Sequence, residues 1–195
     1  MIERHWAKVC GGGFSHVTVR GEPGIGKTRL VADCLDELER WGHGVKRLAC
    51  HPRALDIPFF PFLVALKRDR ACGSGDAAAL LNRLETAAEG TWQERRQRRT
   101  ETIAALAQHF AGEGKPAALW LDDEQWADPS TAETLAALVS CRPSGLLVLT
   151  TTRTPADTPS DEGEIRLGRL RPDDTRKIVA LLLDLSLIHI SEPTR

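Results

Sequence analysis

The sequence predicts an α/β fold, in which helices cover both faces of a parallel β-sheet. The predicted strands 117–121 and 146–152 are runs of apolar and β-branched residues, as expected for strands buried on both faces. These strands alternate with segments of helical periodicity, which is typical of a parallel sheet with crossover helices. Polar clusters follow three strands, and the carboxyl ends of parallel strands meet at one edge. A three-layer domain with a site at that edge is therefore expected.

The first third of the chain contains two predicted helices and two predicted strands. A helix over residues 1–8 stops before the glycines at 11–13, and a β-branched strand covers 16–19. Apolar residues then recur at helical spacing over 28–38, and this helix should end near Trp41 and Gly42. Residues 45–50 are predicted to form the second strand.

The middle third is predicted to be helical after one loop. Prolines at positions 52, 58 and 61 indicate that 51–61 is a loop. Helices are predicted over 62–70, over 76–90 with Asp76 as the N-cap, and over 91–111. Ile103, Leu106, Ala107 and Phe110 should lie on the buried side of the last of these helices.

The last third returns to strands. The strand 117–121 ends in Asp122 and Asp123. Asp128 and Pro129 form an N-cap followed by proline at the first helical position, which predicts a helix to about Ser140. A strand over 146–152, a polar loop over 154–163, an edge strand over 165–167 and a helix over 172–183 complete the prediction.

The run from 21 to 28 matches the phosphate-binding pattern G-x-x-x-x-G-K-S/T at every fixed position. A strand precedes it and a helix follows, which places backbone N–H groups and a helix N-terminus around an anion. Lys27 would contact the β- and γ-phosphates, and the Thr28 hydroxyl would bind Mg²⁺. The sequence therefore predicts a nucleoside triphosphate site. Its binding residues are Gly21, Glu22, Pro23, Gly24, Ile25, Gly26, Lys27 and Thr28.

Three further side chains at strand ends are candidates for catalysis of phosphoryl transfer. Asp122 is predicted to hold Mg²⁺, and Asp123 to polarise the attacking water. A one-residue slip would exchange these roles, and a solvated turn is the alternative to both. Arg153 is predicted to reach the γ-phosphate with its guanidinium group. Its alternative is an exposed loop arginine.

Composition narrows the classes of partner. The 26 basic and 27 acidic residues nearly cancel, so no field favours nucleic acid or an anionic membrane. The basic run 95–99 lacks interleaved aromatics and is expected to be a solvated helix face. No apolar run approaches a membrane span, no secretory signal is recognisable, and the five cysteines form no C-x-x-C pair. A cytoplasmic protein with reduced cysteines is expected.

Three segments together resemble a known module. Residues 20–31, 119–131 with the string Gln125-Trp126-Ala127-Asp128-Pro129, and 149–153 are similar to the AAA-like, origin-recognition-like ATPase module of signal-transduction NTPases. Such modules occur in adenylate/guanylate-cyclase-associated proteins and in large LuxR-type regulators. Residues 3–8 and 50–62 favour the cyclase-associated group. Glu124 departs from the family pattern, which has an apolar residue there. The family segment that helps to hold adenine would lie before Met1.

The resemblance implies a fold, a ligand and a division of the chain. It implies a P-loop NTPase core over 1–168, with an extra strand between the phosphate loop and the acidic strand. A truncated helical lid is expected over 169–185, and 186–195 resembles a non-native read-through tail. ATP and Mg²⁺ would be the ligands, and turnover would be slow and regulatory. Other domains of the full-length protein would be the partners, and an oligomer is compatible with the family.

Two other functions remain open from the sequence. A DNA-associated AAA ATPase of the origin-recognition or loader type would use the same motifs. A phosphotransferase would use the same loop, but no acceptor site or catalytic base for it is recognisable in the sequence.

Overall fold

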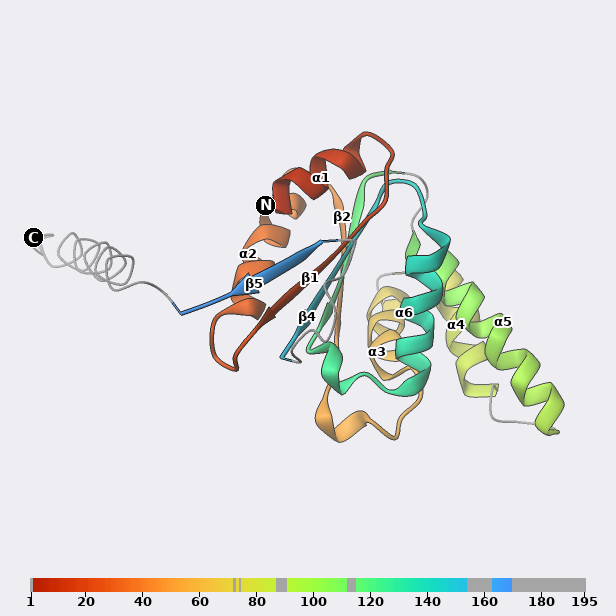
Figure 1. The fold of residues 1–195 in the computed structure, drawn as a ribbon. Helices are drawn as coiled ribbons and strands as arrows, with labels where there is room; N and C mark the ends of the chain where they lie inside the picture. Colours follow the sequence, from red (N-terminus) through yellow and green to blue (C-terminus); the bar gives the residue numbers. More distant parts are fainter. Residues whose placement is uncertain are drawn as a thin grey trace, which may run out of the picture.

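The computed structural model describes residues 2–71, 73, 75–86, 91–111, 115–153 and 163–169. Within these ranges a five-stranded sheet lies between two layers of helices, with α1 and α2 on one face and α3 to α6 on the other (Figure 1). None of the described helices has the length and apolar character to cross a membrane. The α/β class predicted from the sequence is confirmed.

The described elements have the following bounds. The helices are α1 Ile2–Cys10, α2 Lys27–Arg40, α3 Phe60–Ala71, α4 Gly75–Thr86, α5 Trp92–Ala111 and α6 Pro129–Cys141. The strands are β1 Ser15–Gly21, β2 Gly44–Ala49, β3 Ala117–Asp122, β4 Leu146–Thr152 and β5 Glu164–Leu167. Two short 3₁₀ helices are η1 Pro52–Ala54 and η2 Glu124–Trp126.

All strand pairings in the sheet are parallel, and the order is β2-β3-β4-β1-β5. β4 therefore lies between β1, which leads into the phosphate loop, and β3, which leads into the acidic pair. This is the inserted strand that the resemblance implies. Because the strands are parallel, the residues that follow β1, β3 and β4 emerge at the same edge.

Two apolar clusters pack on the two faces of the sheet. Alternate residues of each strand point to opposite faces. Leu147 and Leu149 of β4 join the cluster under α1 and α2, which includes Val31 and Leu35 of α2. Leu146 and Val148 of the same strand belong instead to the larger cluster under α3 to α6, as do Leu106, Ala107 and Phe110 of α5. The buried side predicted for the 91–111 helix is thus correct, although Ile103 is only partly buried.

Two sequence predictions differ from the structure. The predicted loop 51–61 contains η1, and α3 begins at Phe60 inside it. The prolines hid this because Pro52 and Pro61 lie in first turns, where a missing N–H costs little. Asp76 lies in the first turn of α4 and does not cap it, since the helix already begins at Gly75.

Several other predictions fall outside the described residues. These are the end of the 76–90 helix after Thr86, most of the 154–163 loop, the helix over 172–183 and the tail 186–195. The domain boundaries at 168/169 and 185/186 therefore stay predictions. β5 is an edge strand, as predicted for 165–167.

Candidate functional site

The loop between β1 and α2 needs its glycines for two different reasons. Gly24 and Gly26 have φ of 76° and 100°, a backbone region in which side chains are strained. Gly21 has ordinary φ, but a Cβ there would lie 2.9 Å from Ile25 Cγ2 and 2.9 Å from the Leu167 carbonyl oxygen. The first glycine is therefore required by packing against β5, and the other two by the turn.

The N-terminus of α2 faces the loop without a side-chain cap. Gly26 is the N-cap residue and makes no side-chain hydrogen bond, and the first turn contains no acidic residue. The first N–H groups of a helix carry partial positive charge and lack partners within the helix. This helix end therefore suits an anion such as a phosphate.

Lys27 is buried although it is charged. Its side chain is only 6% exposed, and Nζ donates to the carbonyl oxygens of Gly21 (2.9 Å) and Glu22 (3.0 Å). Burial of an ammonium group is tolerated when its protons have acceptors. The lysine thus ties the loop together from inside and presents its charge within the loop.

Thr28 and Asp122 form the contact expected of a Mg²⁺ site. Thr28 Oγ1 lies 3.2 Å from both carboxylate oxygens of Asp122, although 94 positions separate the two residues in the sequence. The hydroxyl of Thr151, on β4, donates to Asp122 Oδ1 and fixes the carboxylate from the other side. Hard oxygen donors of this kind are the ligands that Mg²⁺ prefers. The residues present therefore fit the ion.

Asp123 has a different environment. It adopts a left-handed conformation (φ 53°), and its N–H donates to Thr151 Oγ1 at 2.9 Å. Gln125 Nε2 donates to Asp123 Oδ1 (2.8 Å), and Arg153 Nη2 lies 3.2 Å from Asp123 Oδ2. The backbone turn points this carboxylate away from Asp122 and toward the end of β4.

A cavity of about 380 Å³ joins these groups. Gly24, Gly26, Lys27 and Thr28 line it together with Asp123 and Arg153, while Arg29 and Ala32 of α2 extend it. Asp122 does not line the cavity itself but contacts Thr28, which does. Of the remaining predicted loop residues, Pro23 is exposed, Ile25 packs on Gly21, and Glu22 pairs with Arg169 (3.4 Å) outside the loop.

Two polar residues of this site were given no role in the sequence prediction. Thr151 links both aspartates, and Gln125 contacts Asp123 and the backbone N–H of Arg153 (3.1 Å). A threonine pair that ends a buried apolar strand is the signal that would have indicated the first. The contacts of Gln125 depend on the fold of the turn after β3, so no local sequence signal indicates them.

Asp128 and Glu124 follow the acidic pair in the sequence but do not line the cavity. Asp128 Oδ1 accepts N–H bonds from Ser130 and Thr131, so the predicted N-cap is present. Glu124 is half-buried, and its burial raises the pKa of the carboxyl, while a hydrogen bond from Thr150 and the charge of Arg20 act in the opposite direction.

Comparison with known sequences places the chain in a family. Residues 1–150 match the family described as AAA ATPase domain. The chain therefore belongs to this family of nucleotide-binding P-loop ATPases. No curated protein matches it.

Solved structures resemble the chain over roughly half of their own length or less. They include a DNA replication initiation factor (16% identity, 93% of this chain and 49% of that chain, TM-score 0.47). AMPPCP-bound DnaA from Aquifex aeolicus has 16% identity over 100% of this chain and 51% of that chain (TM-score 0.48). A Signal Transduction ATPase with Numerous Domains from Pyrococcus horikoshii, with a tetratricopeptide repeat sensor, has 15% identity (90% of this chain, 24% of that chain, TM-score 0.41).

Proposed function

We propose that the chain is an ATP-binding regulatory module that hydrolyses ATP slowly within a larger cytoplasmic signalling protein. The observation that carries the proposal is the convergence of Lys27, Thr28, Asp123 and Arg153 on one cavity, with Asp122 held at Thr28. Family membership accounts for nucleotide binding. The assignment of individual roles is our inference from the geometry, and slow turnover is what the resemblance to the signal-transduction module implies.

Each group has a distinct proposed task. The loop N–H groups and the α2 N-terminus bind the phosphates, and Lys27 adds a charge. Thr28 and Asp122 would hold Mg²⁺, which supplies charge neutralisation to the phosphate oxygens when bound. Asp123 orients and polarises the water. Arg153, now paired with Asp123, would exchange that carboxylate for the γ-phosphate.

The regulatory interpretation is supported by what surrounds the cavity. No acceptor-binding site beside the phosphate loop is recognisable in the described ranges, which disfavours a phosphotransferase. The host would be cyclase-associated, or alternatively a LuxR-type regulator, and its other domains would be the partners.

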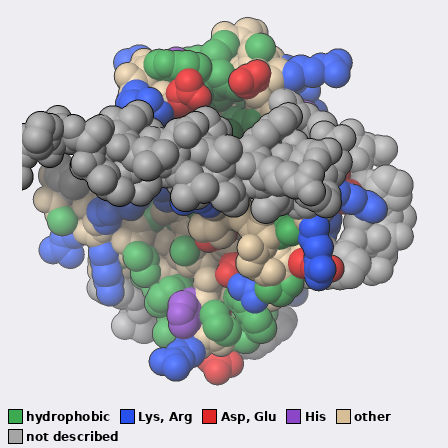
Figure 2. Space-filling model, turned by 90° about the vertical axis from the view of Figure 1, so that its left-hand side faces the viewer, with side chains coloured by type: hydrophobic (Ala, Val, Ile, Leu, Met, Phe, Trp, Pro, Cys, Tyr) green, Lys and Arg blue, Asp and Glu red, His purple; other side chains and the backbone are tan. Residues whose placement is uncertain are grey.

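The near balance of 26 basic and 27 acidic residues supports this host over a DNA loader. The uncovered part of the face in Figure 2 shows Lys and Arg side chains interspersed with Asp and Glu. A loader would be expected to present a basic surface to DNA.

Calorimetry with Mg·ATP tests the phosphate-loop assignment. Lys27→Ala should weaken ATP binding by at least about tenfold, because a charge-assisted phosphate contact is lost. Lys115→Ala is the matched control, since this exposed lysine precedes β3 at the opposite edge of the sheet and should bind ATP normally. Equal affinity of the two variants would refute the site.

Turnover assays separate the alternatives. The chain alone should hydrolyse ATP slowly. Hydrolysis stimulated by duplex DNA, with a steep dependence on salt, would instead favour the loader. Fast phosphoryl transfer to a small acceptor would favour the phosphotransferase.

A further inference from the structure

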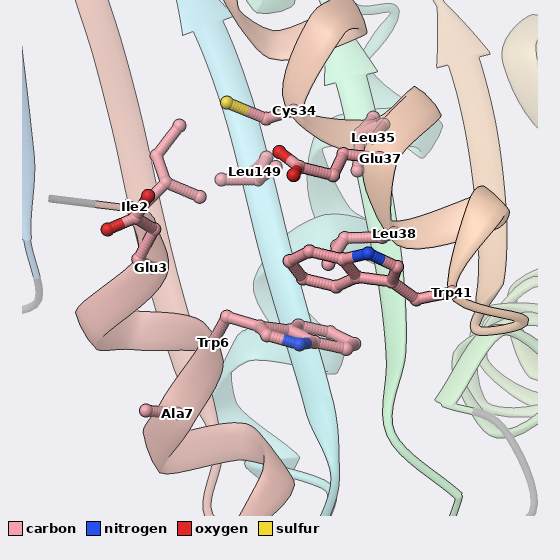
Figure 3. A pocket seen from close by; sticks show the side chains of 10 residues that line it. All are labelled: Ile2, Glu3, Trp6, Ala7, Cys34, Leu35, Glu37, Leu38, Trp41 and Leu149. Carbon is pink, nitrogen blue, oxygen red and sulfur yellow. The ribbon is translucent and has the colours of Figure 1, made fainter.

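A second cavity lies between α1 and α2 and shares no lining residue with the nucleotide cavity. Its volume is about 330 Å³, at the lower end of the range for small-molecule sites. Trp6 of α1 and Trp41, at the end of α2, form two of its walls, and Leu149 of β4 lies at its floor (Figure 3). A largely apolar, preformed hollow is therefore present on the α1/α2 face.

The two indoles are held in different ways. Trp6 is 7% exposed and packs edge-on against the His43 ring, with centroids 4.8 Å apart. Trp41 is 61% exposed, but its backbone N–H is fixed to the Glu37 carbonyl at the C-terminus of α2. The wall formed by Trp6 is thus rigid. The wall formed by Trp41 presents an aromatic face to solvent, and exposure of so large an apolar side chain is unfavourable.

Carboxylates accompany these rings. Glu3 lines the cavity from α1 and Glu37 from α2, where helical spacing places Glu37 directly before Trp41 on the same face. Within the described ranges no ion pair neutralises either carboxylate. Burial lowers the pKa of the neighbouring His5, and the charges of Lys8 and Arg4 lower it further.

The two carboxylates decide which ligand charge the hollow favours. Cys34 also lines the hollow; burial is the main cause that raises the pKa of its thiol, Glu37, Asp33 and Glu3 raise it further, and the N-terminal ammonium group acts in the opposite direction. An anion or a neutral apolar molecule would leave the carboxylates of Glu3 and Glu37 without a counter-charge. A cation with an apolar surface would neutralise them and would also contact the indole faces.

We propose that this cavity binds a small alkylated ammonium ligand, with its methyl groups against Trp6 and Trp41 and its charge balanced by Glu37 and Glu3. Indole is the aromatic ring that binds cations best, and quaternary ammonium groups lose little hydration when they enter such a site. The proposal is independent of the nucleotide site, although α2 connects the two cavities.

The test compares two probes of the same shape and different charge. Choline and 3,3-dimethyl-1-butanol differ in the quaternary nitrogen, which is replaced by carbon. Each is titrated into the ¹⁵N-labelled chain in an amine-free buffer, and the indole N–H signals are followed by NMR. The variants Trp6→Phe and Trp41→Leu assign these signals, since each variant lacks one of them. Choline should shift the Trp6 and Trp41 signals saturably, with an affinity at least about fivefold higher than that of the alcohol.

Variants make the test specific. Trp41→Leu should abolish saturation, and Glu37→Gln should weaken choline binding about threefold or more. Val64→Ala, at a similarly exposed apolar residue of α3, and Glu101→Gln, an exposed acid of α5, should bind choline normally. Equal binding of both probes would show a merely apolar hollow. Absence of saturation, or binding unaffected by Glu37→Gln, would also overturn the proposal.

Discussion

Asp122 and Asp123 are adjacent in the chain, yet their carboxylates have different partners. Asp122 continues the straight strand β3 and meets Thr28, whereas the left-handed turn at Asp123 directs its carboxylate to Gln125 and Arg153. A short polar side chain such as aspartate tolerates this conformation better than a β-branched residue would. The backbone turn, and not the residue type, therefore separates the two proposed roles.

Substitution of each aspartate should give a different kinetic defect. Asp123→Asn should retain ATP binding and reduce turnover by about 100-fold or more, since the amide cannot polarise the water. Asp122→Asn should weaken the dependence of ATP binding on Mg²⁺. Steady-state hydrolysis and calorimetry with and without Mg²⁺ distinguish these outcomes. Hydrolysis at the wild-type rate by Asp123→Asn would show that the roles are assigned incorrectly.

Cys50 should be chemically inert. Burial is the largest cause that raises the pKa of its thiol to about 12, and the neighbouring carboxylate of Asp128 adds to it. Because the thiolate is the reactive form, maleimide at pH 7.5 should label the exposed Cys10 and Cys141 and spare Cys50 until the chain is unfolded. Peptide mapping by mass spectrometry measures this order. Labelling of Cys50 as fast as Cys10 would contradict the buried environment.

Glu124 should make stability depend on pH. Since burial raises its pKa in the folded state, the folded state binds more protons than the unfolded state between the ordinary glutamate pKa and the raised one. Its contribution to the free energy of unfolding is therefore greatest below the ordinary pKa and falls as pH rises through the raised pKa.

The variant Glu124→Gln should not show this fall in the free energy of unfolding with rising pH. It should be more stable than the wild type at neutral pH, and the difference should vanish toward pH 4. Urea unfolding at several pH values measures it, with the exposed Glu101→Gln as control. A variant less stable at neutral pH would show that the charge of Glu124, which the charge of Arg20 favours, stabilises the fold.

At the scale of elements, Asp128 joins the start of α6 to the entry into α3. Its Oδ1 accepts from Ser130 and Thr131 at the start of α6, and also from the N–H of Phe59 at 3.0 Å. Phe59 has φ of 59° and directly precedes α3. The buried carboxylate therefore caps one helix and fixes the entry into another.

Substitution of Asp128 should lower the stability of the fold. Asp128→Ala loses the cap and leaves a buried N–H without an acceptor, so the free energy of unfolding should fall by about 2–4 kcal/mol. Asp128→Asn keeps an acceptor oxygen and should lose less. Urea unfolding compares the two. Equal losses would indicate that the negative charge matters, and not the acceptor.

The contacts of Asp128 illustrate which features cannot be predicted from local sequence. Strands and helices with strong periodicity were predicted closely, because their signal is local. The glycine turn between β1 and α2 follows a local pattern too, while the binding roles of its residues stay predictions. The start of α3 was missed because the prolines indicated a loop there, and because the entry into the helix at Phe59 is fixed by Asp128, 69 positions away in the sequence. The contacts of Thr151 and Gln125 were missed for a similar reason, since their partners are met only when β3 and β4 lie side by side.

For the whole molecule, nucleotide binding should appear as stability. A ligand that binds only the folded state at 100 times its Kd adds about 2.7 kcal/mol to the free energy of unfolding. For a domain of this size we expect Mg·ATP to raise the Tm by about 5–10 °C. Differential scanning calorimetry measures the shift, and AMP, which lacks the β- and γ-phosphates, should give much less. A similar shift in Lys27→Ala would indicate binding elsewhere.

The position of β1 in the sheet also has a consequence for synthesis on the ribosome. β1 precedes both of its neighbours, β4 and β5, which come from the last part of the described chain. At roughly 10 residues per second, the apolar strand with Val17 and Val19 must wait on the order of ten seconds for its first partner. Pairings this distant in sequence also slow folding after release. The nascent chain therefore carries an unpaired apolar strand while all of the residues between β1 and β4 are synthesised, which makes it a natural client for chaperones.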